Sequence, residues 1–548
     1  MKLFQIVFLQ IIILLLSSCI TEIQTDTQTE FQQEENKDLK MYFKVLSRGA
    51  EYEYDDGTQK EKKVESLHLA FYDRGNGVPA LRKTVKASKS PEEGIFTIHG
   101  SFGSNHPDFV IGIANYNESE VSMTDPLFMS SEELISEKGF LMSSVSYFNS
   151  EELVYYTELK DENFPKDESS VPETIVIELE RLASKVTFKK SSDLHTPAVT
   201  VNHGGDLKTL KLTITGWSVN ATERATYLVK ERVPYSEYEE ELGLNGDAWS
   251  WNKESASDEP AGLHWAHSLN YDKNKFPGIG KESEAQEVIY RKYSDFSNLD
   301  FYESEEEERA QYFHETTRRS SLFDESNALP SIMMAGFYTL GEGIEPKTFY
   351  LLETEDTQNL FTEDEYVELM WKRQACLYHN NEGRIEKISL EEFKDLISEM
   401  TPAENVVHQV INPSYVSPQI KAGVRLEGLC DAAGNPYNED VTKLNEMLYQ
   451  NCGLMQKFKD GKCVFLAPIE HFGLIEKDGT MISKTGSYGL VRNNYYNVTL
   501  QSVEGLGHGI PDEDMTIGDF GDSPGNATYT LGIVCRVLPW HRVEGEIN

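Results

Sequence analysis

Basic residues are scarce in this chain of 548 residues, which carries 51 Lys and Arg against 91 Asp and Glu and has a formal net charge of −40. A chain this acidic repels nucleic acid and anionic lipid, because both carry negative charge. We therefore expect no nucleic-acid partner. The charge favours solubility outside the cell and carries no information about the fold.

Cysteine is also rare, with six residues in the whole chain. The spacings of those that follow Cys19 match no zinc pattern, so a metal site built from them is not expected. Cys452 and Cys463 are the closest pair in the sequence and would close a hairpin if the chain is exported to an oxidising compartment. The five cysteines after Cys19 make an odd number, which leaves one of them unpaired.

The motifs of the common enzyme families are missing. The chain has no P-loop, no HExxH, no GxSxG and no EF-hand loop. His264 and His267 could ligate a metal on a helix, and the acidic loop Asp512–Asp522 could hold Ca²⁺, but a structural pair and a solvated loop explain them better. We predict no catalytic residue, no metal and no cofactor, and we expect that the protein is not an enzyme. A deep pocket with a perturbed carboxylate pair would instead favour an exported hydrolase.

One long apolar run is present, Ile6–Leu16, and it follows Lys2 near the N-terminus. It is too short to span a bilayer and ends in Leu16-Ser17-Ser18-Cys19, the pattern of a lipobox. Residues 1–18 are therefore predicted to be a lipoprotein signal peptide and Cys19 the lipidated residue, with a plain secretory signal as the alternative. Residues 19–40 are polar and acidic, which predicts a disordered tether.

Strand patterns dominate the rest of the chain. Apolar residues recur with a period of two between turns rich in Gly, Asn, Asp and Pro, which predicts a mostly β protein. Two capping boxes, Thr362-x-x-Glu365 and Ser389-x-x-Glu392, and the amphipathic stretch Asp440–Gln450 predict short helices. The segments expected as strands are Met41–Leu46, Lys63–Tyr72, Phe109–Tyr116, Thr174–Lys190, Leu210–Val219, Ser417–Gly428, Gly461–Pro468, Tyr496–Gln501 and Tyr529–Leu538.

The last of these strands lies unusually close to the C-terminus. Its apolar positions alternate with small, polar or basic ones, and Pro539 ends it because proline cannot donate to a ladder. A long apolar strand must pair somewhere, since an open apolar edge invites association. It is either the last strand of its own sheet or a strand for another molecule. Its alternating residues are Tyr529, Leu531, Ile533, Cys535 and Val537.

Several strings in the chain also resemble a known family. YGLVRNNYYNVTLQSVEGLGHGI followed by a VLPW ending, the segment ERLASK at Glu180–Lys185, CVFLAPIEHFG, and the N-terminal strings KVESLHLAFYD and PDFVIGIANYN are similar to Mfa-type fimbrial subunits, the shaft proteins of type V fimbriae of Bacteroidales (the FimA/Mfa-like superfamily). Residues 220–470 match the family pattern poorly. The resemblance implies two β-sandwich-like (transthyretin-like) domains with short helical decorations, over residues 41–172 and 173–548, the second with insertions.

The resemblance also implies a mode of assembly. Such subunits are exported as outer-membrane lipoproteins and trimmed by an Arg-specific protease, and the place of the excised first strand is filled by the C-terminal strand of a neighbouring subunit. Here Arg48 fits the cleavage site best, with Arg74 and Arg82 as competitors. The expected partners are other fimbrial subunits, the protease, and surface receptors on host or bacterial cells. The mature form would support adhesion from an extracellular fimbrium.

Two alternatives to a shaft subunit stay open. A tip or accessory fimbrial subunit would cap a filament rather than extend it. A surface glycan-binding lipoprotein of the nutrient-uptake type often has a similar length, and the all-helical kind would show a period of 3.6 residues throughout. The dominance of strand patterns here counts against that kind.

Overall fold

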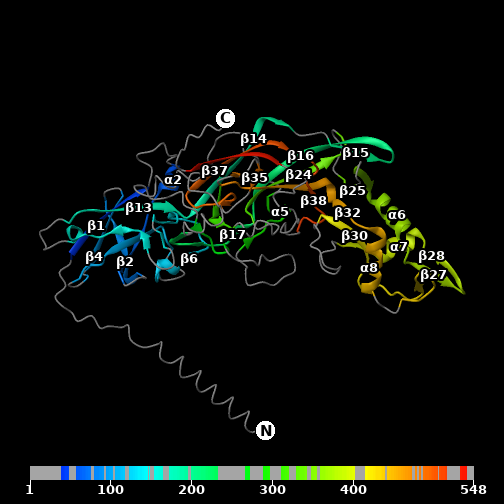
Figure 1. Ribbon diagram of the computed structural model, residues 1–548, viewed down its shortest axis with the longest axis horizontal. Helices are drawn as coiled ribbons and strands as arrows, with labels where there is room; N and C mark the ends of the chain where they lie inside the picture. Colours follow the sequence, from blue (N-terminus) through cyan, green and yellow to red (C-terminus); the bar gives the residue numbers. More distant parts are fainter. Residues whose placement is uncertain are drawn as a thin grey trace, which may run out of the picture.

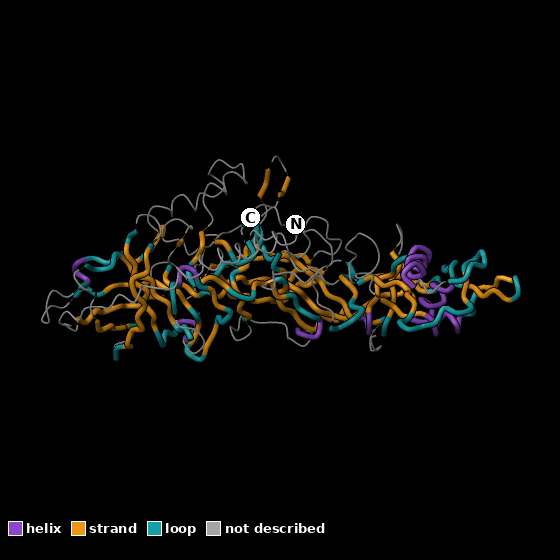
Figure 2. Tube along the Cα trace, turned by 90° about the horizontal axis from the view of Figure 1, so that it is seen from below, coloured by secondary structure: helices purple, strands orange, loops and turns teal. Residues whose placement is uncertain are grey.

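The computed structural model describes the backbone of residues 39–47 and 531–539 and most of residues 57–514, where the longest gaps are 233–265, 272–287, 297–309, 320–328 and 401–413. The described part is elongated and mostly β, as predicted from the sequence (Figure 1). Figure 2 shows that strands run along its whole length, while much of the helix lies toward one end.

Eight strands form the sheet of the N-terminal domain, in the order β12-β5-β2-β3-β4-β1-β13-β9. Strand β5 also pairs with β9, so seven of these strands close into a ring. The eighth, β12, lies outside the ring and pairs with β5 alone. Strands β2 and β5 are apolar along nearly their whole length because both of their faces are covered. The strands are β1 (Leu39–Ser47), β2 (Leu67–Asp73), β3 (Ala80–Lys89), β4 (Ile95–Gly100), β5 (Phe109–Ala114), β9 (Met142–Ser144), β12 (Thr157–Glu158) and β13 (Ile175–Arg181).

The segment expected as a strand pair or bent strand over 174–190 is two strands in different sheets. Strand β13 belongs to the N-terminal ring, whereas β14 (Ala183–His195) pairs with β22 (Gln311–His314) and β37 (Asn494–Val503). The chain therefore changes sheets at Leu182, later than the boundary at residue 172 that the sequence suggested.

Two sheets pack face to face in the C-terminal domain. One has the order β22-β14-β37-β39, with β39 (Leu531–Pro539) at its edge. The other has ten strands, in the order β29-β30-β32-β25-β26-β15-β16-β24-β33-β38. Their shared core makes this domain a sandwich, with the alternation expected of two inner faces. The core includes Val186, Phe188, Trp217, Val219, Ile332, Met334, Phe465, Ala467, Tyr496, Val498 and Leu500.

The ten-stranded sheet continues from the sandwich toward the other end of the molecule. Its two halves meet at a narrow joint, where β15 and β26 share the single register pair Asn202 and Asn359, whose side chains are hydrogen bonded at 3.0 Å. The strands are β15 (Val199–His203), β16 (Asp206–Asn220), β24 (Ser331–Thr339), β25 (Phe349–Glu353), β26 (Gln358–Thr362), β29 (Ile397–Met400), β30 (Tyr415–Ile420), β32 (Met455–Phe458), β33 (Lys462–Pro468) and β38 (His508–Gly509).

The predicted helices are present and begin where the capping boxes place them. Thr362 caps α6 (Glu363–Arg373) and Ser389 caps α7 (Leu390–Leu396), each with a reciprocal Glu three residues later. With α8 (Val441–Cys452) they cover a third apolar core against β25, β30 and β32. These helices are short, as expected, but they enclose a core of their own instead of lying on the surface as decorations.

The cysteine pairing suggested by the sequence is wrong. Cys376, Cys430, Cys452 and Cys463 are all buried free thiols. Cys452 ends α8 in the helical core, whereas Cys463 lies on β33 in the sandwich core, so the two belong to different hydrophobic clusters.

Shorter elements connect these parts. They are α2 (Gln59–Lys62), α5 (Tyr293–Phe296), η1 (Pro126–Phe128), η2 (Asp161–Asn163), η7 (Lys459–Gly461), β6 (Ser130–Ser131), β7 (Ile135–Ser136), β8 (Gly139–Phe140), β10 (Tyr147–Phe148), β11 (Leu153–Tyr155), β17 (Thr222–Glu223), β18 (Thr226–Tyr227), β19 (Lys230–Arg232), β20 (Ala266–His267), β21 (Val288–Ile289), β22 as above, β23 (Thr316–Thr317), β27 (Tyr378–Asn381), β28 (Arg384–Lys387), β31 (Leu429–Cys430), β34 (Ile475–Lys477), β35 (Thr480–Ile482) and β36 (Gly489–Leu490).

Candidate functional site

The first strand occupies an internal place in the N-terminal ring. Strand β1 pairs antiparallel with β4 over Leu39–Lys44 and parallel with β13 over Phe43–Ser47. It is therefore hydrogen bonded to β4 along its first six residues and to β13 along its last five, and Phe43 and Lys44 have partners on both sides. We call the place that it fills, between β4 and β13, the β1 slot.

The neighbours of β1 in register are core residues. Met41 and Phe43 lie opposite Ile98 and Phe96 of β4, and Val45 lies opposite Ile177 of β13. Those three partners are at most 4% exposed. Because register partners on adjacent strands share a face of the sheet, these alternate positions of β1 belong to the core face.

A short anchor follows the slot in the chain. Helix α2 is closed by a capping box between Thr58 and Glu61, and the Glu61 side chain is 1% exposed. Its carboxylate accepts from Lys185 Nζ at 3.0 Å and from the Tyr312 hydroxyl at 2.6 Å. The main chain between β1 and β2 is thus held to the start of the C-terminal domain by a buried ion pair.

The two family-like strings meet beside this anchor. Arg181, from ERLASK, donates from Nε to the Glu61 carbonyl at 2.7 Å and from Nη1 to Oδ1 of Asn493, from VRNN, at 3.2 Å. The backbone N–H of Asn493 donates in turn to the Ala183 carbonyl at 2.7 Å. Segments about three hundred residues apart in the sequence therefore join where the chain passes from one domain to the next.

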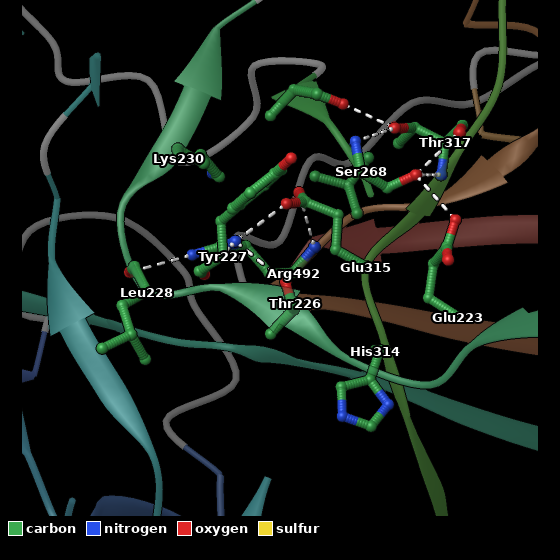
Figure 3. Close-up of polar contacts among 12 residues, drawn as sticks. Glu223, Thr226, Tyr227, Leu228, Lys230, Ser268, His314, Glu315, Thr317 and Arg492 are labelled. Carbon is green, nitrogen blue, oxygen red and sulfur yellow. Dashed lines mark hydrogen bonds and ion pairs between the residues drawn. The ribbon is translucent and has the colours of Figure 1, made fainter. Parts of the chain in front are cut away.

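Arg492 extends this contact to a further segment (Figure 3). Its guanidinium donates to Glu315 at 3.0 Å, to the Thr226 hydroxyl at 3.0 Å and to the carbonyls of Tyr227 at 2.7 Å and Leu228 at 3.3 Å. Leu228 belongs to the core of the N-terminal domain. Arg492, which lies just before strand β37 of the sandwich, therefore ties this part of the chain to a segment that packs on the other domain.

We call this region the junction network. Among the described residues, four ion pairs have both side chains no more than 1% exposed, and all of them lie in or next to it. Such pairs are stable only when both charges are present and hydrogen bonded, because an unpaired buried charge is very costly. The pairs are Lys185 with Glu61, Lys230 with Glu180, Arg318 with Glu223 and Arg492 with Glu315.

Burial acts differently on two of these carboxylates. Burial raises the pKa of Glu61, but the Tyr312 hydroxyl and the Lys185 ammonium outweigh it, so the pKa lies below its ordinary value. For Glu180, burial prevails over Lys230 and Arg492 and raises the pKa. The network is thus a buried polar structure in which each of the four charged pairs is enclosed by protein.

Strand β39 is the edge strand of the four-stranded sandwich sheet, at the end opposite β22 (red in Figure 1). It pairs antiparallel with β37, where Ile533, Cys535 and Val537 lie opposite Leu500, Val498 and Tyr496. Those three partners are at most 1% exposed. The prediction of a strand that ends at Pro539 is confirmed, and only one edge of β39 is paired within the part of the chain that the structure describes.

The sequence-predicted site residues are thus only partly placed. Leu531, Ile533, Cys535 and Val537 lie on β39 at positions that share the core face, whereas Cys19, Arg48 and Tyr529 lie outside the described residues. The competing arginines are described. Arg74 is exposed and pairs with Glu158 at 3.1 Å, and Arg82 lies within β3 and pairs with Asp73 at 2.5 Å.

The weaker metal candidates have other partners where they are described. The His267 ring lies 4.2 Å from that of Tyr271, and Glu513 accepts from Lys462 at 2.5 Å. His264 and residues 515–522 of the acidic loop lie outside the described residues. Within the described ranges, no group of three His, Cys, Asp or Glu side chains is arranged to hold a metal ion.

Sequence reasoning missed the junction network, although one signal for it was available. Thr58-x-x-Glu61 is a capping box of the same kind as those that identified α6 and α7. The partners Glu223, Glu315 and Arg318 stand among many other charged residues, and nothing in the local pattern marks them as buried.

Comparison with known proteins supports the family resemblance at the C-terminal end. Residues 456–546 match the family model described as the C-terminal part of fimbrillin, the major fimbrial subunit protein type IV. The matched region contains β33, β37 and β39, and it includes the C-terminal strings CVFLAPIEHFG, YGLVRNNYYNVTLQSVEGLGHGI and VLPW, but not ERLASK or the N-terminal strings. This match confirms the fimbrial resemblance predicted from the sequence. A search of curated proteins gave no match.

Solved structures that resemble this chain over most of its length include the following three. A candidate cell adhesion protein from Parabacteroides distasonis is 12% identical over 92% of this chain and 98% of its own, with a TM-score of 0.35. A candidate cell adhesion protein from Bacteroides eggerthii is 9% identical over 91% and 96%, with a TM-score of 0.32. The tip fimbrial protein Mfa3 from Porphyromonas gingivalis is 8% identical over 87% and 96%, with a TM-score of 0.29. These likenesses are too distant to carry an argument.

Helices of membrane-spanning length and apolarity are not found in the described part of the chain.

Proposed function

We propose that this chain is a structural subunit of a surface fimbria that polymerises by exchanging strands. It is exported as a lipoprotein acylated at Cys19, anchored in the outer membrane, cut after Arg48 by an Arg-specific protease, and completed by the C-terminal strand of a neighbouring copy. The mature fibre is extracellular and supports adhesion to receptors on host or bacterial surfaces. The fimbrillin match over residues 456–546 and the place of β1 in its ring support this proposal.

The single observation that carries it is the position of β1. Because β4 borders the first part of β1 and β13 borders the last part, removal of β1 alone opens a slot that leaves one unpaired stretch on each of these two strands. An apolar slot of that kind is a binding site for another strand. Refilling it buries four or five apolar side chains, which contributes on the order of 10 kcal/mol before ordering costs.

The sequence position of Arg48 suits such a cut. It directly follows Ser47, the last residue of β1, so cleavage there removes β1 and nothing else of the ring. Cleavage after Arg74 would also remove α2 and the buried strand β2, and cleavage after Arg82 would divide β3. The anchor at Glu61 would hold the new N-terminal segment in place after cleavage at Arg48.

The edge position of β39 favours a shaft subunit over a tip subunit. A tip subunit needs only to accept a strand, whereas a shaft subunit must accept one and supply one. Strand β39 is nine residues long, is paired along one edge by β37, and is the same length as β1. A contact between the slot of one copy and the tail of the next is heterologous and does not close, so it builds a filament.

The test is assembly of the purified precursor after treatment with an Arg-specific protease. We expect a ladder of SDS-resistant oligomers from the wild-type chain and none from Arg48→Lys, which keeps the charge but resists the protease. The matched controls Arg74→Lys and Arg82→Lys should still assemble. Equal assembly of the Arg48→Lys variant, or a trimmed wild-type chain that stays monomeric, would overturn the proposal.

A further inference from the structure

The two strands at opposite ends of the described chain resemble each other position by position. Strand β1 reads LKMYFKVLS and β39 reads LGIVCRVLP. The first, seventh and eighth residues are identical, and the sixth is basic in both, Lys44 in β1 and Arg536 in β39. Nothing in the sheet topology brings these strands together within one molecule, because they belong to different sheets.

The two strands also have the same core-facing phase. The odd positions of β1 lie opposite Ile98, Phe96 and Ile177 in the N-terminal ring. The odd positions of β39 lie opposite Val503, Leu500, Val498 and Tyr496 in the sandwich. In both strands the third, fifth and seventh positions therefore lie opposite buried residues, and a slip by one residue would reverse this in both.

From this correspondence we infer that β39 of one copy takes the β1 slot of another in a single register, with Leu531 in the place of Leu39 and Val537 in the place of Val45. The inference rests on the proposed strand exchange and adds its register and direction. The incoming strand runs parallel to β13 and antiparallel to β4, as β1 does.

The basic residue agrees with this register. Lys44 lies opposite Val176 of β13, whose side chain is 44% exposed, so the charged residue at this position belongs to an open face. In the inferred register Arg536 takes that place and its guanidinium reaches water. A shift of two residues toward the start of the slot would put Arg536 opposite Thr97, which is 7% exposed. A buried, unpaired guanidinium is strongly unfavourable.

The proline agrees as well. In the inferred register Pro539 takes the place of Ser47, the last residue of the slot, which pairs with β13 alone. A proline is tolerated at a strand end because its missing N–H removes no internal ladder bond. The same shift of two residues would put Pro539 in the place of Val45, inside the ladder with β13. The opposite shift avoids both problems and sets Arg536 opposite the acidic Glu178, but it leaves the place of Leu39 and Lys40 empty and carries Leu538 and Pro539 past the end of the slot, so ladder pairing is lost at both ends.

Disulfide trapping in the full chain distinguishes these registers. All variants carry Cys535→Val to remove the strand's own thiol, and the four described cysteines are buried. The test variant adds Val176→Cys and Arg536→Cys. The matched controls combine Val176→Cys with Val534→Cys or Leu538→Cys, which lie on the same face of β39, two residues to either side. Each variant is treated with the protease, mildly oxidised and fully denatured by heat, and is then analysed by SDS gel electrophoresis with and without reductant.

We expect a reducible ladder from the Arg536→Cys variant at least tenfold stronger than from either control, and no ladder from any uncut chain. A ladder from the Val534→Cys or Leu538→Cys variant instead, or SDS-resistant assembly of all variants without any crosslink, would overturn the register while leaving strand exchange intact. If both the Cys535→Val chain and the unsubstituted chain stay monomeric after cleavage, strand exchange itself would be overturned.

Discussion

Removing the positive charge of Arg492 should loosen the junction between the domains. In the Arg492→Met variant, the Glu315 carboxylate loses the guanidinium 3.0 Å away while both positions are no more than 1% exposed. The hydroxyl of Thr226 and the carbonyls of Tyr227 and Leu228 also lose their donor. Breaking a buried pair by removing one partner costs about 3–5 kcal/mol.

Removing both charges should cost less than removing either one. In the double variant Arg492→Met/Glu315→Leu no buried charge is left unpaired, and only the acceptors of the 226–228 segment remain unsatisfied. At about 1 kcal/mol for each lost hydrogen bond, the double variant should be destabilised by roughly 1–3 kcal/mol. The two single effects are therefore strongly non-additive, as expected for residues in direct contact.

Scanning calorimetry measures these effects. For a domain of this size a loss of 1 kcal/mol lowers Tm by roughly 2–4 °C, so Arg492→Met should lower it by about 10 °C. The control is Arg384→Met, which breaks an ion pair with Glu386 in which the arginine is 82% exposed, and it should change stability by less than about 0.5 kcal/mol. Equal shifts for Arg492→Met and Arg384→Met, or additive single effects, would refute the reasoning.

Three further predictions concern other parts of the fold. Burial lowers the pKa of His471 to about 3, so the neutral ring stabilises the fold fully above the unfolded pKa near 6.5, and this contribution is lost as the pH falls toward 3. In His471→Gln, the free energy of unfolding from urea titrations should fall less steeply between pH 6 and 4, by about 1.4 kcal/mol per pH unit, and an unchanged slope would contradict this. Thr362→Ala should destabilise the helical core by about 1 kcal/mol, whereas Thr362→Ser should not, because serine keeps the capping hydroxyl. Urea unfolding followed by circular dichroism measures this, and equal midpoints for the two variants would show that the capping box does not stabilise this core. Gly461→Ala should cost about 1–3 kcal/mol, because the residue has φ +71° and a Cβ there would lie 2.2 Å from the carbonyl oxygen of Tyr338, whereas Gly205→Ala, also at positive φ but with nothing within 4 Å of its Cβ, should cost less in the same assay.

The sequence predicted those parts of the fold that depend on patterns among residues close together in the chain. Alternation identified β1, β16, β37 and β39, because side chains on a strand alternate between its two faces. Strand β5 was identified instead as a short continuous apolar run, because both of its faces are covered. The capping boxes predicted the first residues of α6 and α7 correctly. In each box the hydroxyl of the N-cap residue accepts from the backbone N–H of the Glu three residues later, and the carboxylate of that Glu accepts from the backbone N–H of the N-cap residue.

What the sequence could not predict depends on contacts between distant segments. Nothing local to Glu61, Glu315 or Arg492 distinguishes a buried charge from a solvated one, since burial is set by the segments that pack around them. The same reason explains the change of sheets at Leu182, where one apolar run supplies strands to two domains. The closure of the ring through β9 was also invisible, because a strand of three residues has too few positions to show a period.

That closure has a consequence for a copy that is waiting for its partner. In an open sheet, taking out β1 would separate β13 and β9 from the other strands and leave two fragments with no hydrogen bonds between them. Because β5 also pairs with β9, the six remaining ring strands stay connected in the continuous order β4-β3-β2-β5-β9-β13. Under the proposed strand exchange, a trimmed molecule would therefore keep its remaining ring strands in one connected sheet with a single gap, joined across β5 and β9 by the pairing of Ile113 and Ala114 with Ser143 and Met142 and by the bonds of the Ser144 hydroxyl to Gly112.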